Sequence, residues 1–479
     1  MPGRARIIVT NELPADLHWA SAWQLREAVV TRRLSAVEVT RHFIERTARL
    51  DERTHAFFTL AADAALVQAE DIDRRIHRGE PVGPLAGVPI SVKDQLWTKG
   101  IRTTGGSLVY VDHVPEQDSL HVLRVKAADG VIIGKTSTPE FGMFWRTVGR
   151  VAPECLNPWD PKRTAGGSSG GAAASVAAGF GPLALGTDAG GSIRLPAAMC
   201  GVLGVLPSNG RVPRHGSFGT TLFFSGVGPI CRDTRDAAIL LQLLAQPSVE
   251  DPLCRLDAAP DYLAQLDQGI AGLRLGWWED RSVAREVDAA VIAAIRAAAF
   301  CLGSLGAHLV DDAVTFDTDG IDKAWRVLDF VDRYAALGEA LHGDPAARSK
   351  LTAYAQERFA WAKDVSGADY SRAVRRRAEF IRSFESAFRD CDLVLSPTLG
   401  FTAPLIDSVG PAERIPALVA YTLAVNLAGF TAASIPCGFV DGLPIGLQVI
   451  APPNQEALVL RAARAVEQAW PWTERKPVM

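Results

Sequence analysis

The segment GGSSGGAAASVAA, residues 166–178, joins a glycine-serine block to a run of small apolar residues. A flexible linker would not lead directly into a run that favours a helix, whereas glycines at a helix start leave backbone N–H groups accessible. The segment therefore predicts a tight loop followed by a buried helix. Such a loop can place free backbone N–H groups near a reacting group.

A further serine, Ser192, lies 24 residues after Ser168 in the segment GTDAGGSIRLP, residues 186–196. The two glycines before Ser192 let successive backbone N–H groups converge on one small volume, where the oxyanion of an acyl-transfer reaction would form. A tight turn that exposes a serine explains this segment equally well when the segment is taken alone. The oxyanion-hole hypothesis covers Ala189, Gly190, Gly191 and Ser192.

A lysine, Lys93, follows the apolar segment LAGVPISV of residues 85–92. Lysines at strand ends are usually solvated, but a serine nucleophile needs a base, and a desolvated lysine supplies one. Lowering a lysine pKa from about 10.4 to near 7 requires roughly 4 to 5 kcal/mol of destabilisation of the cation. Burial has to provide this free energy, and Asp94 would oppose it if its side chain pointed inward.

These three segments, in this order, resemble the amidase signature family. The resemblance extends to GRVP at 210–213, SPT at 396–398 and GFVDGLPIGLQ at 438–448, and it is weakest between about 240 and 390. It implies a triad of a lysine, a serine with a cis peptide bond and a nucleophilic serine, with no cofactor and no metal. The triad residues here would be Lys93, Ser168 and Ser192, supported by hydrogen bonds from Ser169, Thr187, Asp188 and Arg194.

The pattern of short apolar runs and helical stretches predicts one large α/β domain. The resemblance implies the amidase signature fold, in which helices cover a central mixed β-sheet. We expect an N-terminal helical layer (1–79), the signature core (80–240) and the rest of the same domain (241–479), with a variable helical cap at about 310–390. Strands are predicted at 88–92, 131–133, 272–278, 308–310, 393–395 and 432–436. Helices are predicted at 287–305 and 458–470.

The N-terminal layer contains a helix-start signal. Ser35 and Glu38 form a predicted capping box, and the apolar residues Val37, Ile44 and Ala48 are expected on one side of the helix.

Composition excludes several classes of protein. With 48% hydrophobic and 22% charged residues, the chain can bury a large core. Its 50 Lys and Arg against 54 Asp and Glu include no long basic run, so nucleic acid is not expected as a partner. No apolar stretch is long enough for a membrane span or a secretory signal, so we expect a cytoplasmic protein. We further expect a monomer or homodimer that acts on a small-molecule substrate. Seven scattered cysteines predict buried free thiols rather than disulfides or a zinc site.

Two rival functions start from the same glycines. Residues 166–170 also fit the G-x-S-x-G elbow of Ser-His-Asp esterases, with Ser168 as nucleophile. The preceding residues NPWDP at 157–161 are not expected to form the strand that an elbow requires, and the available downstream histidines are His215, His308 and His342. The stretch GVIIGKT at 130–136 has three residues between its glycines instead of the four of a phosphate-binding loop, so it predicts a strand and turn.

The expected reaction is hydrolysis of a C–N acyl bond through an acyl-enzyme. The bulky residues Met143, Phe144 and Trp145 favour a small apolar aryl or alkyl amide as substrate, although they fit an ordinary core equally well. Two alternatives come from the resemblance. One is a urethanase that cleaves carbamates with an esterase side activity. The other is the glutaminase subunit of an amidotransferase, against which stand this bulky rim and the segment LPS at 206–208, where the family usually has Lys-Pro-Thr.

Overall fold

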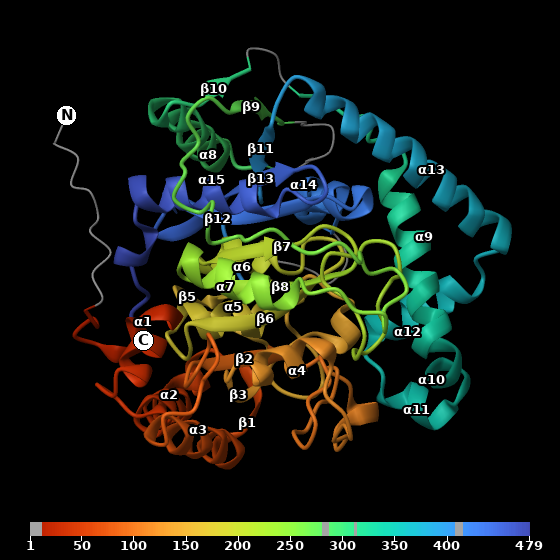
Figure 1. The fold of residues 1–479 in the computed structure, drawn as a ribbon. Coiled ribbons are helices and arrows are strands. Elements are labelled where there is room, and N and C mark those ends of the chain that lie inside the picture. The colour runs from red at the N-terminus through yellow and green to blue at the C-terminus, as the bar shows by residue number, and fades with distance from the viewer. Residues whose placement is uncertain (1–11, 280–286, 311–313, 408–414) are drawn as a thin grey trace.

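A mixed β-sheet runs through the molecule from its lower to its upper end in Figure 1. The computed structural model describes residues 12–279, 287–310, 314–407 and 415–479. In these ranges the sheet has eleven strands: β1 (Phe57–Leu60), β2 (Pro89–Lys93), β3 (Val131–Thr136), β6 (Leu183–Asp188), β7 (Leu203–Leu206), β8 (Gly226–Cys231), β9 (Arg274–Trp277), β10 (His308–Leu309), β11 (Leu393–Pro397), β12 (Thr431–Val440) and β13 (Leu443–Ala451). Their order in the sheet is β1-β3-β2-β6-β8-β7-β12-β13-β11-β9-β10.

The pairing confirms a mixed sheet. Strands β3, β2 and β6 are parallel to one another, as are β11, β9 and β10, whereas the strands between these groups pair antiparallel. Every residue of β2, β3 and β6 is buried, which explains why each strand begins with successive apolar residues instead of alternating apolar and polar ones.

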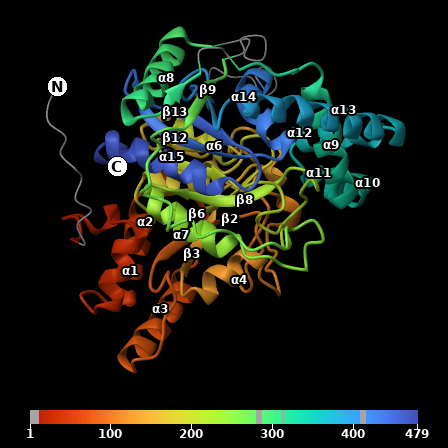
Figure 2. The same cartoon turned by 45° about the horizontal axis from the view of Figure 1, so that its top comes forward.

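Helices cover the sheet on both faces (Figures 1 and 2). They are α1 (Ala22–Val30), α2 (Ala36–Leu50), α3 (Ala62–His77), α4 (Leu120–Ala127), α5 (Gly170–Ala177), α6 (Arg194–Cys200), α7 (Thr234–Leu244), α8 (Ala289–Cys301), α9 (Ile321–Arg333), α10 (Glu339–Gly343), α11 (Pro345–Lys350), α12 (Ala353–Lys363), α13 (Gly367–Ser386), α14 (Ile415–Ala428) and α15 (Glu456–Ala469). A π-helical turn, Tyr334–Gly338, links α9 to α10. Helices α9–α13 stand together along one side in both views.

Alternate strand residues belong to different cores. Leu183 and Leu185 of β6 pack in the core that contains α4, α7, α8 and α15, whereas Ala184 packs with α5 and α6 on the opposite face. Because side chains alternate across a strand, one short segment supports two layers of helices. The expected fold, a single large α/β domain, is therefore confirmed.

The structure of the N-terminal region differs from two of the predictions for it. The capping box of Ser35 and Glu38 is present, but Ala48 is exposed and the buried stripe of α2 instead includes Val39 and Phe43, which lie one turn apart. The side of α2 that is buried is the side that packs against α3 and the sheet, and the positions of apolar residues within α2 do not determine it alone. Residues Phe57–Leu60, inside the expected helical layer, form strand β1, which pairs antiparallel with β3.

The remaining predicted elements are present. The predicted strands coincide with β2, β3, β9, β10, β11 and β12, and the predicted helices with α8 and α15. Residues 131–136 form a buried strand, as expected from their spacing. As expected, the segment NPWDP does not form the strand that an elbow requires. Leu156–Asn157 (β4) and Asp160–Thr164 (β5) form a separate two-stranded sheet just before the glycine-serine block. This ribbon is not a strand of the central sheet.

Five of the seven cysteines are buried free thiols, Cys437 is partly buried and Cys301 is exposed. None of the helices that the structure describes has the length and apolar character needed to cross a membrane.

Candidate active site

The predicted catalytic residues meet where parallel strands and helix starts converge. Lys93 is the last residue of β2, and Thr187 lies near the end of β6, its parallel neighbour. Ser168 lies just before α5 and Ser192 just before α6. Because the carboxyl ends of neighbouring parallel strands meet at one sheet edge, residues 94 positions apart in the sequence come into contact.

The ammonium or amine nitrogen of Lys93 is completely buried and lies among three hydroxyls. Its Nζ atom is 2.7 Å from Ser168 Oγ, 2.9 Å from Ser169 Oγ and 2.7 Å from Thr187 Oγ1. The peptide bond between Gly167 and Ser168 is cis, as the family resemblance predicts. No carboxylate contacts the nitrogen among the described residues, so hydroxyl groups alone hydrogen bond to it.

The directions of the neighbouring hydrogen bonds determine what Lys93 can do. Ser169 Oγ donates to the Thr187 carbonyl oxygen at 3.1 Å, and Thr187 Oγ1 donates to Gln95 Oε1 at 3.0 Å. Gln95 is fixed in this orientation because its Nε2 donates to the carbonyls of Phe141 and Phe218. Both hydroxyls therefore use their protons elsewhere and accept from Lys93.

A neutral amine has two N–H donors and one lone pair. With both donors directed at Ser169 and Thr187, the lone pair of a neutral Lys93 faces Ser168 Oγ. The arrangement thus suits an amine that accepts the hydroxyl proton of Ser168.

Electrostatics favour this neutral form. Burial, followed by the positive charge of Arg333, lowers the pKa of Lys93 well below its ordinary value of 10.5, and Asp188 opposes the shift. Asp94 points elsewhere, since its carboxylate accepts from the backbone N–H and hydroxyl of Thr104 at 2.8 and 2.5 Å. The Asp94 carboxylate is therefore not directed at Lys93 Nζ, and the geometry that would have opposed a neutral lysine is not present.

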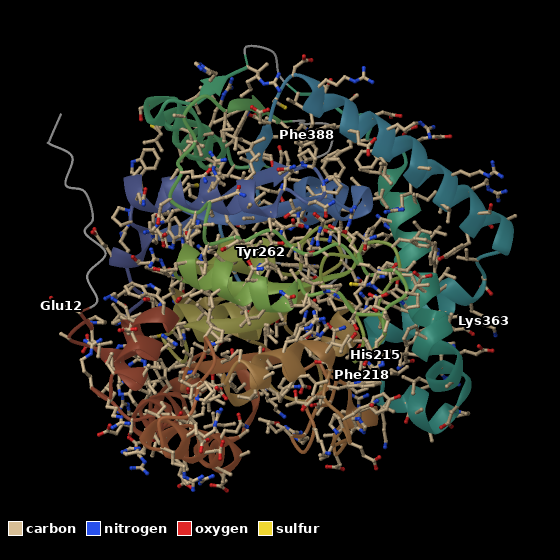
Figure 3. All side chains as sticks on the ribbon, viewed as in Figure 1. Glu12, His215, Phe218, Tyr262, Lys363 and Phe388 are labelled. Atoms are coloured by element: carbon tan, nitrogen blue, oxygen red, sulfur yellow. The ribbon has the colours of Figure 1, made fainter. Side chains whose placement is uncertain are left out.

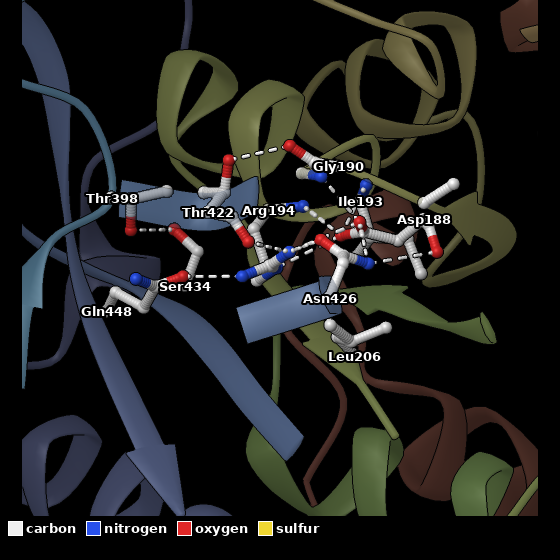
Figure 4. A network of polar contacts seen from close by, with 12 residues as sticks. Asp188, Gly190, Ile193, Arg194, Leu206, Thr398, Thr422, Asn426, Ser434 and Gln448 are labelled. Carbon is white, nitrogen blue, oxygen red and sulfur yellow. Dashed lines mark hydrogen bonds and ion pairs between the residues drawn. The ribbon is translucent and has the colours of Figure 1, made fainter. Parts of the chain in front are cut away.

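The loop that carries Ser192 is held by a buried ion pair (Figure 4). Asp188 accepts the Gly191 N–H at 2.6 Å and the Ile193 N–H at 3.1 Å, and Arg194 Nε lies 3.0 Å from the same carboxylate. Burial raises the pKa of Asp188, but Arg194 and the backbone donors outweigh it, so the net pKa is below the ordinary value. The Gly191 N–H is therefore engaged by Asp188 and does not point toward a substrate, which corrects the expectation for that residue.

Arg194 extends the network to the far side of the site (Figure 4). Its guanidinium donates to Gln448 Oε1 at 2.7 Å, to the Thr422 carbonyl at 3.0 Å and to Asn426. Strand β13 and helix α14 are thereby tied to the Ser192 loop. Ser192 itself is partly exposed, and its carbonyl accepts the Ser169 N–H at 3.0 Å, so the two serine loops lie directly against each other.

A cavity of about 1030 Å³ opens at Gly167, Ala189, Gly190 and Ser192. Its walls combine aromatic and charged side chains, many from helices α9 and α12. The aromatic residues are Phe144, Trp145, Trp325, Phe330, Tyr354 and Trp361. The charged residues are Arg146, Arg150, Asp322, Lys323, Arg326, Asp329, Arg333, Glu357 and Arg358.

The bulky residues Met143, Phe144 and Trp145 lie between the apolar core and the cavity. Met143, Phe144 and Trp145 line the cavity, yet they are only 3 to 5% exposed and pack within apolar clusters. These three side chains are therefore part of the apolar core and also form one wall of the cavity.

The three histidines that a Ser-His-Asp enzyme could use do not line the cavity in the described part of the chain. His215 lies beside Phe218, and the rings of both contact Trp97 (Figure 3). Within the described ranges, none of His215, His308 and His342 lines the cavity. These positions disfavour a Ser-His-Asp arrangement at Ser168. No cluster of three potential metal ligands occurs in the same ranges.

Several residues around the site were not predicted from the sequence. Thr422 and Asn426 are polar residues four positions apart in the apolar helix α14, a signal of a polar face that the sequence offered. Gln95 follows the lysine segment directly. Trp325 and Arg333 come from the region where the family resemblance is weakest, and no local pattern distinguishes them.

The chain is similar to known proteins over most of its length. The sequence profile of the family described as Amidase matches residues 38–460. The chain is 37% identical, over 93% of its length and 95% of the relative's, to a subunit of the glutamyl-tRNA(Gln) amidotransferase of Anaeromyxobacter dehalogenans.

Two solved structures show the same fold. A bacterial aryl acylamidase of the amidase signature family matches with a TM-score of 0.87 and 30% identity, over 95% of this chain and 97% of that one. A 6-aminohexanoate cyclic dimer hydrolase matches with a TM-score of 0.88 and 27% identity, over 96% and 99%. The chain belongs to the amidase signature family. It is an enzyme that hydrolyses amide C–N bonds.

Proposed function

We propose that Ser192 is the nucleophile of this amidase, with Ser168 as proton relay and Lys93 as the base. The observation that carries the proposal is the completely buried Lys93, whose three hydroxyl neighbours leave its lone pair facing Ser168. A buried neutral amine is a competent base near neutral pH. Ser169 and Thr187 orient it, and Asp188 with Arg194 holds the loop that presents Ser192.

The first half of the reaction forms an acyl-enzyme. Ser168 gives its proton to Lys93 Nζ and takes the proton of Ser192, whose Oγ bonds to the carbonyl carbon. In the structure the hydroxyls of Ser168 and Ser192 are not hydrogen bonded to each other, so a side-chain rotation of Ser192 precedes this step. When the tetrahedral intermediate collapses, Lys93 returns the proton through Ser168 to the leaving nitrogen, and the C–N bond breaks.

The second half releases the acid. Water loses a proton to the same relay and attacks the acyl carbon, and Ser192 regains its proton as the ester bond breaks. In both halves the negative oxygen would be held by backbone N–H groups of Ala189, Gly190 and Ser192. Gly191 has no part in this set, because its N–H is used by Asp188.

We propose small aryl or alkyl amides as substrates. Six aromatic side chains line the cavity at the proposed nucleophile, and such walls favour apolar acyl groups. Carbamates present the same carbonyl and would yield an amine, carbon dioxide and an alcohol, so urethanase activity with esterase side activity is part of this proposal. The helical region at about 310–390 would act as a substrate-facing cap, since Trp325, Phe330 and Trp361 reach the cavity from it.

A second candidate is hydrolysis of glutamine as one component of an amidotransferase. The 37% identity to an amidotransferase component favours it. So does Arg358, whose guanidinium lies over the rings of Phe144, Phe330 and Tyr354 without an ion pair to any described residue. An amino-acid carboxylate would suit such a cation.

We propose that the enzyme acts alone, as a monomer or homodimer, in the cytoplasm. Its cysteines are free thiols, which suits a reducing compartment. Light scattering of the purified chain, combined with turnover without any added protein, tests the first part.

The central test is Ser192→Ala, which should abolish turnover of an aryl anilide. The matched control is Ser225→Ala, since the buried Ser225 hydroxyl has no hydrogen-bond partner in the described chain and its removal should be neutral. Undiminished turnover by Ser192→Ala would refute the assignment. An anilide, a primary amide, a carbamate and an ester with the same aryl group, together with free glutamine, would then rank the substrates. Hydrolysis of glutamine alone would replace the first candidate with the second.

A further inference from the structure

The proposed oxyanion loop is contacted from outside the signature core by Trp325 of helix α9. The indole Nε1–H of Trp325 donates to the Ala189 carbonyl oxygen at 2.7 Å. Its ring also lies close enough to Gly190 that a Cβ atom there would be 2.9 Å from Cζ2. Both contacts involve the residues whose N–H groups we assign to the oxyanion.

Peptide geometry links the indole to the proposed oxyanion donor. The Ala189 carbonyl and the Gly190 N–H belong to one planar trans peptide, in which the C=O and N–H vectors point in opposite directions. A donor that fixes the carbonyl therefore fixes the N–H on the other side. Hydrogen bonding at the carbonyl also polarises the peptide and strengthens its N–H as a donor.

The next peptide is fixed in the same way but for another purpose. Thr422 Oγ1 donates to the Gly190 carbonyl at 2.8 Å, and the Gly191 N–H of that peptide donates to Asp188 at 2.6 Å. Successive peptides of the loop are thus each held at both ends, except that the Gly190 N–H has no acceptor in the described chain. That N–H remains available to a substrate oxygen.

We propose that Trp325 is a positioning residue for amide hydrolysis, which holds and polarises the 189–190 peptide so that the Gly190 N–H stabilises the oxyanion. This inference rests on the proposed role of Ser192. It makes the oxyanion site dependent on α9, a helix outside the segments that resemble the family. The competing role for Trp325 is that of a cavity wall that contacts the substrate directly.

The test compares Trp325→Phe with Trp472→Phe. Both variants remove an indole hydrogen bond to a backbone carbonyl, but the Trp472 indole donates to the Arg232 carbonyl at 2.9 Å and Trp472 does not line the cavity. Loss of an oxyanion donor itself costs about 10²- to 10³-fold in kcat, so loss of a group that positions one should cost on the order of 10-fold. We expect Trp325→Phe to lower kcat by about that factor with KM nearly unchanged, and Trp472→Phe to leave both kcat and KM nearly unchanged.

Inhibitors separate the two roles of Trp325. An aryl trifluoromethyl ketone forms a tetrahedral oxyanion on a catalytic serine, whereas the product acid does not. For Trp325→Phe the inhibition constant of the ketone should rise about 10-fold, in step with kcat, while that of the acid stays constant. A rise in KM and in the constant of the acid, with kcat unchanged, would overturn the inference in favour of a cavity wall.

Folding and the parent proposal are controlled separately. If Trp325→Phe fails to fold, incorporation of 3-benzothienylalanine at position 325 removes the N–H while keeping the ring shape, and the same kinetic pattern is expected. Ser192→Ala should prevent formation of the ketone adduct. If it does not, the proposed nucleophile is wrong. If it does but both 325 replacements react normally, only the role of Trp325 is refuted.

Discussion

Replacement of Arg194 by methionine should destabilise the whole protein. The Arg194 guanidinium is completely buried, and it bonds to Asp188, Gln448 and Asn426 and to the carbonyl of Thr422. Arg194→Met keeps much of the apolar stem but leaves the Asp188 carboxylate buried without its counter-charge. The backbone N–H groups of Gly191 and Ile193 remain as its partners.

The size of the effect follows from this geometry. Removing one partner of a buried ion pair typically costs about 3 to 5 kcal/mol. An unfolding entropy of about 2.1 cal/mol/K per residue gives about 1 kcal/mol/K for 479 residues. We therefore expect the Tm of Arg194→Met to fall by roughly 3 to 5 °C.

The assay is thermal unfolding at pH 7, followed by circular dichroism. The matched control is Arg274→Met, because Arg274 forms an ion pair with Asp392 in which both side chains are substantially exposed. Such surface pairs contribute about 0 to 1 kcal/mol, so this control should shift Tm by about 1 °C or less. Because Asp188→Asn removes the unpaired charge, the double variant of Asp188 and Arg194 should lose less than the sum of the two single variants.

A Tm for Arg194→Met equal to that of Arg274→Met would refute the reasoning. It would mean that the Asp188 carboxylate finds compensation without Arg194. Additive losses in the double variant would likewise show that the charge pairing is not the source of the stability.

Two further predictions concern the proposed base. Because the folded chain holds the pKa of Lys93 below its unfolded value of 10.5, the unfolded chain binds more protons between those values, and stability is lost as pH falls through that window. Lys93→Met should therefore lack turnover but have a higher Tm than the unchanged protein at pH 7. This difference in Tm should become smaller as the pH rises toward 10. A difference in Tm that stays constant with pH would contradict a neutral lysine. Arg333→Gln should raise the pKa of Lys93 and move the ascending limb of kcat/KM to higher pH, whereas Arg326→Gln, on the same helix, should leave it in place. If the ascending limb does not move in Arg333→Gln, burial alone accounts for the lowered pKa of Lys93.

The sequence determined the local features of this protein. Continuous apolar runs identified β2, β3 and β11, and the glycine-serine block identified the loop before α5. These predictions succeeded because strand burial and the backbone freedom of glycine depend on residues that are adjacent in the sequence. The order of the three family-like segments then connected Lys93, Ser168 and Ser192 without any knowledge of the fold.

Tertiary structure decided how those features act. The sequence could not assign the Gly191 N–H to Asp188, place Ala48 in solvent or bring Trp325 to the Ala189 carbonyl. Each of these depends on a partner far away in the chain or on a direction that only the folded backbone sets. Burial of the Lys93 nitrogen is the clearest case, because the strands and loops that exclude water from it come from separate parts of the sequence. A residue pattern records which chemistry is available, whereas desolvation and donor direction arise only when distant segments pack together.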